Sequence, residues 1–184
     1  MKINAEKFIM MADRAGVSDE QLAAALPRAS DRRKEHELAL KKVRNWMAGR
    51  NHPAAKSADV TALAGAMGCS PSDFASFSST HRFARSAPRK ARLLADLIRG
   101  RSIDEADALL RFSTKRAAVM VRKVLRSAID QAEANDAELD RLVVSEVKVD
   151  DSVRIKRFQP KDRGRAHPII KRTSHITVAV EEGG

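Results

Sequence analysis

Aromatic side chains are scarce in this 184-residue chain, which has no tyrosine, one tryptophan and six phenylalanines. Modules that read single-stranded nucleic acid usually stack bases on exposed aromatic rings. The shortage therefore disfavours a reader of single strands. If the chain binds nucleic acid, it is expected to use phosphate contacts and the shape of folded RNA.

Cysteine and long apolar runs are also lacking. Cys69 is the only cysteine, so an internal disulfide and a cysteine-based zinc site are excluded. Because Cys69 follows a helix-like apolar stretch with no flanking base, we expect a buried, unreactive thiol. No apolar run approaches the roughly 20 residues that span a bilayer, and no signal-peptide core follows the first residues. These features predict a cytoplasmic protein without membrane insertion.

Motifs of catalysis and of cofactor binding are missing as well. The sequence holds no G-x-x-x-x-G-K phosphate loop and no H-E-x-x-H pair. The histidines show no metal-ligand spacing; they are His36, His52, His81, His167 and His175. We therefore expect no enzymatic activity, no cofactor and no metal site.

Positive charge is what the chain has in excess, with 35 Lys and Arg against 24 Asp and Glu and a formal net charge of +11. Such an excess predicts a polyanionic partner, either nucleic acid or an anionic membrane surface. Residues 1–79 hold 12 basic and 9 acidic residues (+3), whereas residues 80–184 hold 23 and 15 (+8). The polyanion-binding signal therefore lies mainly in the second half.

The first half, residues 1–79, is predicted to be a separate domain of short helices. Helix ends and starts are indicated at Gly16, at Ser18 with Gln21, at Ser57 and at Ser70. Residues 76–79, with the sequence SFSS, are expected to link this domain to residues 80–184.

The second half begins with three predicted helices, at residues 89–99, 102–112 and 114–135. One side of the third helix is apolar: Ala117, Val121, Val124, Leu125, Ala128 and Ala132. The opposite side is basic: Lys115, Arg116, Arg122, Lys123 and Arg126, with Val119 among them. A basic face is usually only solvated, but here no acid at i,i+4 relieves the repulsion, which favours contact with phosphates.

From residue 142 the apolar pattern changes to a period of two. Val143, Val147 and Val149 alternate with Val144, Glu146, Lys148 and Asp150, and Ile176, Val178 and Val180 repeat the alternation. Helices followed by strands predict an α+β fold with an antiparallel sheet.

Between these strands, residues 154–172 contain eight basic residues and one acid, Asp162. Gly164, flanked by Pro160 and Pro168, would permit a turn. Two arms of about ten residues would reach roughly 35 Å, as a protruding β-hairpin over about residues 150–175. Such a ribbon is marginally stable alone, so an anionic partner should order it. The alternative is a disordered basic loop in the isolated protein.

The second half contains five motifs in a fixed order: RSAPRKAR at 85–92, ADLIRG at 95–100, KVLRSAI at 123–129, RGR at 163–165 and KRTSHI at 171–176. Together they resemble the ribosomal protein L22 family of the large subunit. The resemblance covers about residues 80–182 without a large gap. It implies a structural protein that binds large-subunit rRNA, supports assembly and lies beside neighbouring ribosomal proteins. Its basic hairpin would thread through rRNA into the wall of the peptide exit tunnel.

The resemblance also assigns residues. By motif, the contacts of the globular part with rRNA are Arg85, Lys90, Arg92 and Arg99. The contacts of the hairpin are Lys156, Arg157, Arg163, Arg165, Lys171 and Arg172. The charge pattern itself adds Lys115, Arg116, Arg122, Lys123 and Arg154. The tip that would meet the nascent chain is Lys161, Asp162, Arg163 and Gly164. The family usually has Arg and then a small residue at 161 and 162, so Asp162 adds a carboxylate there.

Residues 1–79 resemble the helix-turn-helix domain of Cro and phage repressors, through the segments 16–26, 43–49 and 63–70. Residues 27–37 would lengthen the turn before the recognition helix by about ten residues. Trp46 and Leu63 are expected in the core, whereas Lys41, Lys42, Arg44 and Arg50 either touch phosphates or form a solvated face. The rival function is a DNA-binding regulator, which would need a second subunit to read paired half-sites. A repressor does not require the basic hairpin, which favours the ribosomal function.

Overall fold

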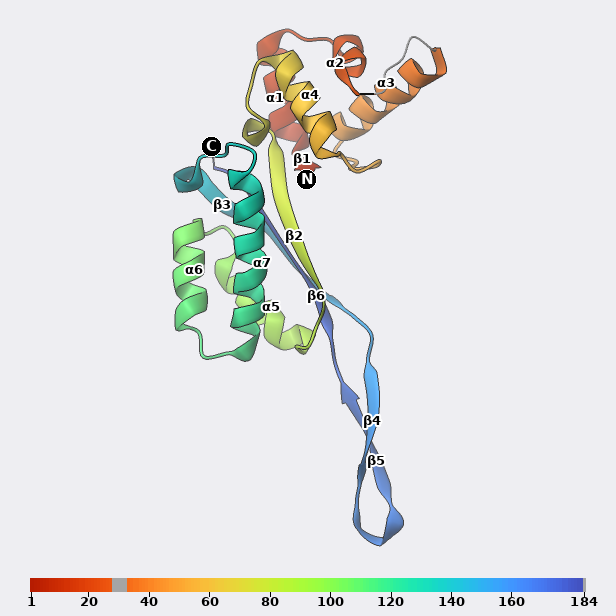
Figure 1. Ribbon diagram of the computed structural model, residues 1–184, viewed down its shortest axis with the longest axis vertical. Helices are drawn as coiled ribbons and strands as arrows, with labels where there is room; N and C mark the ends of the chain where they lie inside the picture. Colours follow the sequence, from red (N-terminus) through yellow and green to blue (C-terminus); the bar gives the residue numbers. More distant parts are fainter. Residues whose placement is uncertain (28–32, 184) are drawn as a thin grey trace. The chain divides into compact units, whose positions relative to one another are not determined.

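The computed structural model describes residues 1–27 and 33–183 (Figure 1). Contacts divide the chain into two compact units. Unit 1 comprises Met1–Phe77, Gln131–Arg141 and the residues from Glu181 onward. Unit 2 comprises Ser78–Asp130 and Leu142–Val180. Helices and antiparallel strands are both present, so the predicted α+β class is confirmed.

Unit 1 is mainly helical. Its elements are β1 (Lys2–Ile3), α1 (Ala5–Ala15), α2 (Asp19–Ala25), α3 (Arg33–Met47), α4 (Ser57–Met67) and the 3-10 turn η1 (Pro71–Asp73). Gly16 ends α1 in the left-handed conformation, with φ 63°. Ser18 and Gln21 form the predicted capping box, in which each side chain accepts the other's backbone N–H. The local signals thus define the first two helices.

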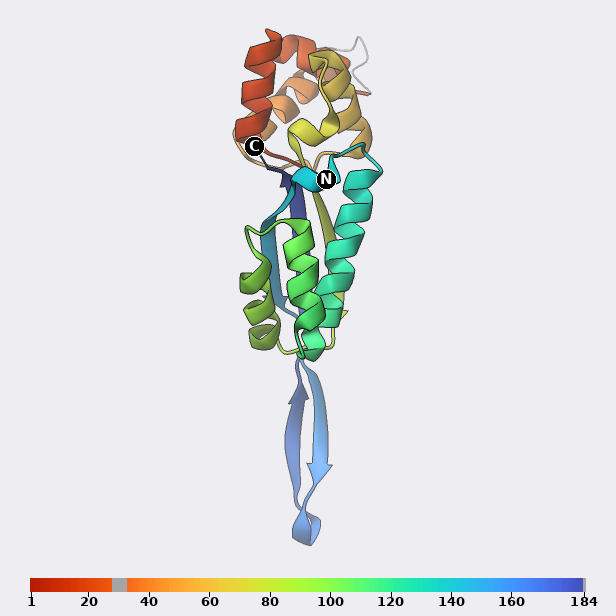
Figure 2. The ribbon, with the colours of Figure 1, turned by 90° about the vertical axis from the view of Figure 1, so that its left-hand side faces the viewer.

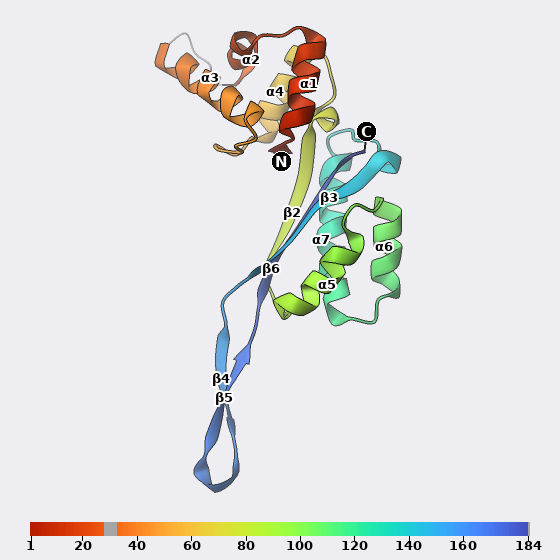
Figure 3. The same ribbon diagram turned by 180° about the vertical axis from the view of Figure 1, so that it is seen from behind.

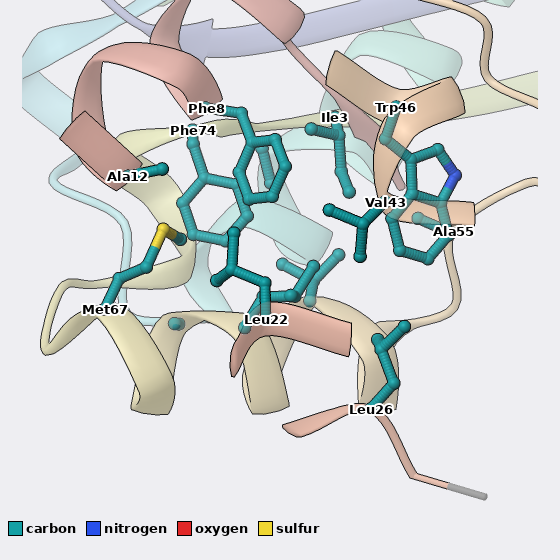
Figure 4. Packing of buried hydrophobic residues seen from close by; sticks show 14 of the residues in the cluster. Ile3, Phe8, Ala12, Leu22, Leu26, Val43, Trp46, Ala55, Met67 and Phe74 are labelled. Carbon is teal, nitrogen blue, oxygen red and sulfur yellow. The ribbon is translucent and has the colours of Figure 1, made fainter. Parts of the chain in front are cut away.

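The core of unit 1 lies between these helices (Figure 4). The rings of Phe8 and Phe74 pack with centroids 5.5 Å apart. Trp46 and Leu63 are buried as predicted, and the Trp46 indole Nε1–H donates to the carbonyl of Pro53 at 2.7 Å. Burying one such large side chain contributes about 1.5–3 kcal/mol. Unit 1 therefore has a hydrophobic core of its own.

Two expectations for the first half are wrong in detail. Residues 76–79 are not a linker but lie inside the ten-residue strand β2 (Ala75–Ala84), with Phe77 fully buried. The serines suit a strand because their hydroxyls are bonded: Ser76 Oγ donates to Lys2 O at 3.2 Å and Ser79 Oγ to Ser127 Oγ at 3.1 Å. Residues 33–37 extend helix α3 rather than a turn, and residues 28–32 lie outside the described part. The predicted helix start at Ser57 is confirmed: Ser57 is the first residue of α4, with Lys56 as its N-cap.

Cys69 is only partly buried, contrary to the expectation of a buried thiol. Burial raises its pKa, and the nearby carboxylate of Asp73 raises it further. Both effects favour the protonated thiol, which is the less nucleophilic form.

The three predicted helices of unit 2 are α5 (Pro88–Ile98), α6 (Ile103–Phe112) and α7 (Arg116–Glu133). They lie side by side on one face of the sheet (Figure 2). The predicted apolar side of α7 is buried along its length, from Ala117 to Ala132. A single helical layer therefore covers the sheet in this unit.

The sheet has the strand order β1-β2-β6-β3, with β3 at Leu142–Asp151 and β6 at Ser174–Glu182. Ile176, Val178 and Val180 of β6 are fully buried, as predicted. In β3 the predicted alternation is wrong at its start, because Val144 is buried and Val143 is only half-buried. The buried positions are even-numbered at Leu142 and Val144 but odd-numbered at Val147 and Val149. One extra residue in the strand would cause such a shift in the alternation.

The hairpin is a separate two-stranded sheet of β4 (Ile155–Pro160) and β5 (Ala166–Lys171) (Figure 3). Its register pairs Ile155 with Lys171 and Pro160 with Ala166. The paired arms are six residues long, shorter than the ten predicted. The turn lies at the predicted place, with Arg163 at φ 55° and Gly164 at φ 71°. In the described ranges, no helix is long and apolar enough to cross a membrane.

Candidate nucleic-acid interface

Helices α5 and α7 begin with positive charge, against the usual preference for acids at helix starts. Helix α5 has Ala87 as N-cap, with no side-chain cap, and its first turn contains Arg89 and Lys90 but no acid. Helix α7 also has no acid in its first turn, and Lys115 and Arg116 stand at its start. A cation near the positive end of a helix dipole costs about 0.3–1 kcal/mol. An anion bound beside these helix starts would interact favourably with both the cations and the helix dipoles.

Helix α6 follows the usual rule and gives the contrast. Ser102 is its N-cap, and the Ser102 hydroxyl accepts the N–H of Glu105 at 3.4 Å. Asp104 and Glu105 supply acids in its first turn. The basic starts of α5 and α7 are therefore a local feature, since a neighbouring helix of the same unit is capped normally.

The two basic helix starts meet in one hollow of unit 2. The residues that line this helix-start hollow are Arg85, Ser86, Ala87, Lys90, Leu93, Lys115, Arg116 and Ala117. Four of them are cations that the sequence predicted as rRNA contacts, and none is an acid. All four cations are exposed. The hollow can therefore accept a phosphate group from solvent.

Arg92 and Arg99, also predicted as rRNA contacts, fasten α5 to β3. The Arg92 Nε–H donates to Val149 O at 3.2 Å, and Arg99 Nη2 donates to Val147 O at 3.1 Å. A guanidinium has five N–H donors, and both side chains remain about half exposed. These residues thus hold the helix in place while keeping donors open to solvent.

Arg122 has a protein partner instead of an open face. Its guanidinium makes two hydrogen bonds, of 2.6 and 3.0 Å, with the carboxylate of Asp107 on α6. The hydrogen bond from Arg122 lowers the pKa of Asp107, and the charges of Arg122, Arg126 and Arg111 lower it further against the opposing effect of burial. The same bond raises the pKa of Arg122. Repulsion between the cations of α7 is thus relieved by an acid on the neighbouring helix α6. The spacing of charges within α7 alone does not reveal this acid.

The remaining predicted cations are exposed. Lys123 lies on the outer side of α7. The hairpin cations, all exposed, are Arg154, Lys156, Arg157, Lys161, Arg163, Arg165, Lys171 and Arg172. Within the described residues, no ion pair joins any of these hairpin cations to an acid. The hairpin is therefore a ribbon of free positive charge.

The hairpin tip is closed by its backbone. The N–H of Lys161 donates to Arg165 O at 2.7 Å, and the N–H of Arg165 donates to Asp162 O at 3.2 Å. The side chains of the tip residues all face solvent. The tip can thus present Lys161, Asp162 and Arg163 to a partner without rearranging the strands.

One aromatic pair was missed by the sequence analysis. Phe83 has φ 57°, a left-handed conformation that bulky side chains rarely adopt, and its side chain is exposed. The N–H of Phe83 donates to His175 Nδ1 at 3.2 Å, and the two rings meet edge to face with centroids 4.8 Å apart. No sequence pattern predicts a left-handed Phe, so this pair could be found only in the structure.

A family model described as ribosomal protein L22p/L17e matches residues 79–181, which is more than half of the chain. The chain belongs to this family. It is therefore a protein of the large ribosomal subunit, in the cytoplasm, and takes part in translation. The matched range contains the helix-start hollow, the hairpin and the Phe83–His175 pair, whereas residues 1–78 precede it. In the described part of the chain, no three His, Cys, Asp or Glu side chains are grouped as metal ligands.

Proposed function

We propose that this L22-family chain binds large-subunit rRNA through two basic surfaces, the helix-start hollow and the hairpin, and thereby supports subunit assembly. The observation that carries the proposal is the hairpin, whose eight cations are all exposed. A two-stranded ribbon without a core is marginally stable in water. Phosphates along the ribbon would neutralise its charge and hold it in one conformation.

The two surfaces have different roles in this proposal. The hollow fixes one phosphate group beside the starts of α5 and α7, which orients the globular part on the RNA. The hairpin threads between RNA segments and brings its tip to the wall of the peptide exit tunnel. There Lys161, Asp162 and Arg163 would face the nascent chain, with Asp162 as the single negative charge. The role is structural and involves no catalytic step.

Salt dependence of binding tests the proposal. Each phosphate contact with RNA contributes roughly 0.7–0.9 to the slope of log K against log salt. We expect the double variants Lys90→Gln/Lys115→Gln and Arg157→Gln/Lys171→Gln each to reduce the slope by about 1.5. The control Arg14→Gln removes an exposed charge on α1 of unit 1 and should leave the slope unchanged.

The wild-type chain should also co-sediment with large subunits in sucrose gradients and survive a moderate salt wash. A flat salt dependence, or an equal loss of slope in Arg14→Gln, would show that these surfaces do not bind phosphates. Finding the chain only in the soluble pool would overturn the ribosomal assignment of function.

The rival function, a DNA-binding regulator, would use helix α3. Arg44, one of its cations, is ion-paired with Asp19 of α2 at 3.7 Å. Lys41 and Lys42 line a hollow together with Leu26, Leu38 and Ala39, so they border apolar side chains. The basic hairpin has no role in such a regulator, and we therefore favour rRNA binding.

A further inference from the structure

The two faces of the hairpin differ in chemistry. Residues directly opposite each other in an antiparallel pair point to the same face, and successive residues alternate between faces. The register therefore places three pairs on one face: Lys156 with Ile170, Phe158 with Pro168, and Pro160 with Ala166. The other face holds Ile155 with Lys171, Arg157 with Ile169, and Gln159 with His167. We call the first the apolar face, because it carries one charge among six side chains.

The apolar face is left uncovered by the described residues of the chain. Phe158 is 73% exposed and Ile170 is 50% exposed. Pro160, Ala166 and Pro168 are exposed as well. On the opposite face, by contrast, the isoleucines Ile155 and Ile169 are only partly exposed. An exposed aromatic ring at the centre of an apolar face indicates a surface that a partner covers.

The surrounding charge decides which kind of partner fits. Lys156 lies on the apolar face itself, Arg157 and Lys171 lie on the opposite face, and the tip and base add further cations. A protein surface that covered this face would have to be apolar and strongly acidic along the whole ribbon. Folded RNA supplies both chemistries everywhere, since each nucleotide carries a phosphate and a base with two flat π-faces.

We propose that the apolar face of the hairpin packs on exposed rRNA bases, with the Phe158 ring stacked on one of them and Pro168 and Ile170 beside it. This inference rests on the proposed function and assigns the two faces separate tasks. The opposite face and the tip contact phosphates and set the salt dependence. The apolar face contacts bases and adds affinity that salt does not weaken. Phe158 is thereby an rRNA-binding residue that charge patterns alone do not reveal.

Paired substitutions on the two faces test this division. Phe158→Ala should weaken binding of the full chain to large-subunit rRNA on the order of tenfold, the loss typical of one base–aromatic stack. Its salt slope should stay at the wild-type value, because no phosphate contact is removed. Gln159→Ala changes a neighbouring exposed side chain on the opposite face and should change the affinity less than about twofold. Phe158→Leu, which keeps apolar area but lacks the ring, should fall between Phe158→Ala and wild type.

Fluorescence gives a direct readout of stacking. In Phe158→Trp, rRNA should quench the emission of the new indole, measured after subtraction of the wild-type signal from the buried Trp46. His167→Trp on the opposite face is the matched control and should be quenched much less. None of these positions contributes to a core, so circular dichroism should match wild type throughout.

Three results would overturn the inference. If wild type binds rRNA with a steep salt dependence while Phe158→Ala binds equally well and Phe158→Trp is not quenched, the base contact is absent and the proposed function stands. If quenching occurs in assembled subunits but not with rRNA alone, a neighbouring protein covers the apolar face. If wild type does not bind rRNA at all, the proposed function fails and this inference fails with it.

Discussion

The Arg and Lys side chains of unit 2 have two different roles that the sequence does not distinguish. Some hold elements of the fold together, and others are exposed to solvent. Arg122 and Lys123 are adjacent cations on α7, yet Arg122 binds Asp107 while Lys123 is exposed. Arg92 and Arg99 look like phosphate contacts by motif and also donate to β3 carbonyls. Charge alone therefore overstates how many cations are free to bind RNA.

Asp107→Asn should destabilise unit 2, because it removes a carboxylate that accepts two hydrogen bonds from Arg122. We expect the melting temperature at neutral pH to fall by about 2–4 °C, since the pair is partly exposed and screened. The pKa of Asp107 is lowered in the folded state. The stabilisation is therefore complete above the usual aspartate pKa of about 3.9 and is lost as pH falls through the lower folded value.

Thermal melts of wild type and Asp107→Asn, measured from neutral pH to below the usual aspartate pKa of about 3.9, check the prediction. Their difference should be largest above about pH 4 and should shrink towards zero in stronger acid. Asp130→Asn, an exposed acid on α7, is the control and should show no such pH-dependent difference. A constant difference at all pH values would contradict an ionised Asp107 as the cause.

Sequence reasoning succeeded for residues whose roles depend on near neighbours and failed for those that depend on distant ones. The capping box of Ser18 with Gln21 and the buried Trp46 were predicted correctly. The bond from Phe83 to His175 joins residues 92 positions apart, and no local pattern encodes it. The apolar face of the hairpin was readable in principle, but the abundance of charge in residues 154–172 concealed the period of two around Phe158.

At the scale of elements, the hairpin is separable from the fold that carries it. Its tip residues are exposed and contribute nothing to either core. Replacing residues 161–165 by Asn-Gly would join Pro160 to Ala166, which are already paired, through a turn that suits two-residue hairpins. We expect the melting temperature and the helical circular dichroism signal to stay at wild-type values, and the shortened chain to enter large subunits.

Under the proposed function, translation should respond to the same change, because the proposal places the tip at the tunnel wall and the shortened hairpin removes it. Ribosomes with the shortened chain are expected to differ from wild type in pausing or in sensitivity to antibiotics that bind the tunnel. A scrambled tip of unchanged length and composition is the control for loss of specific contacts. Loss of helical signal in the shortened chain would contradict the separation of hairpin and core.

Helices were easier to predict than strands in this chain. Each helix of unit 2 has a regular apolar stripe, and the observed bounds of α5, α6 and α7 differ from the predicted ones by two residues or fewer. Strand β2 was missed because its serines suggested a linker, whereas their hydroxyls find partners only when distant residues pair beside them. The phase change in β3 likewise has no signal before the strand is placed in its sheet.

At the scale of the whole molecule, the question is whether the first half folds and functions apart from the second. Sequence predicts domains at 1–79 and 80–184, with the first dispensable for assembly. Strand β2 starts at Ala75, so a cut at 79/80 would sever it. We expect a fragment of residues 73–184, which keeps β2 whole, to fold and to enter large subunits. Residues 80–184 should melt at a lower temperature, because they lack half of strand β2, including Ser79 and its hydrogen bond to Ser127.

Thermal unfolding and incorporation into subunits, measured for both fragments and for residues 1–79, check this prediction. Equal melting temperatures of the two longer fragments would show that residues 73–79 add nothing to the stability of residues 80–184. If residues 73–184 are insoluble or are excluded from subunits, the first half is needed for the fold and the two-domain prediction is wrong.

Unit 1 is built from segments that are far apart along the chain. The Asn4 side-chain amide donates to Glu181 Oε2 at 3.2 Å, and the Lys7 ammonium donates to the carbonyl of Glu182. The N–H of Glu138 donates to Glu182 Oε1 at 2.9 Å. Hydrophobic periodicity indicates which residues face a core, but it does not indicate which core. These long-range pairings therefore could not be predicted from the sequence.

Because unit 1 contains segments from both ends of the chain, it begins to be synthesised first but is complete only when the last residues are made. Ribosomes add roughly 5–20 residues per second. The segment between Phe77 and Glu181, about 100 residues long, therefore takes about 5–20 s to make. Throughout that interval the helices α1–α4 exist without the segment that contacts Asn4 and Lys7. The part of the protein that is made first is therefore finished last. The basic hairpin, at residues 155–171, is already synthesised when the final segment of unit 1 is added.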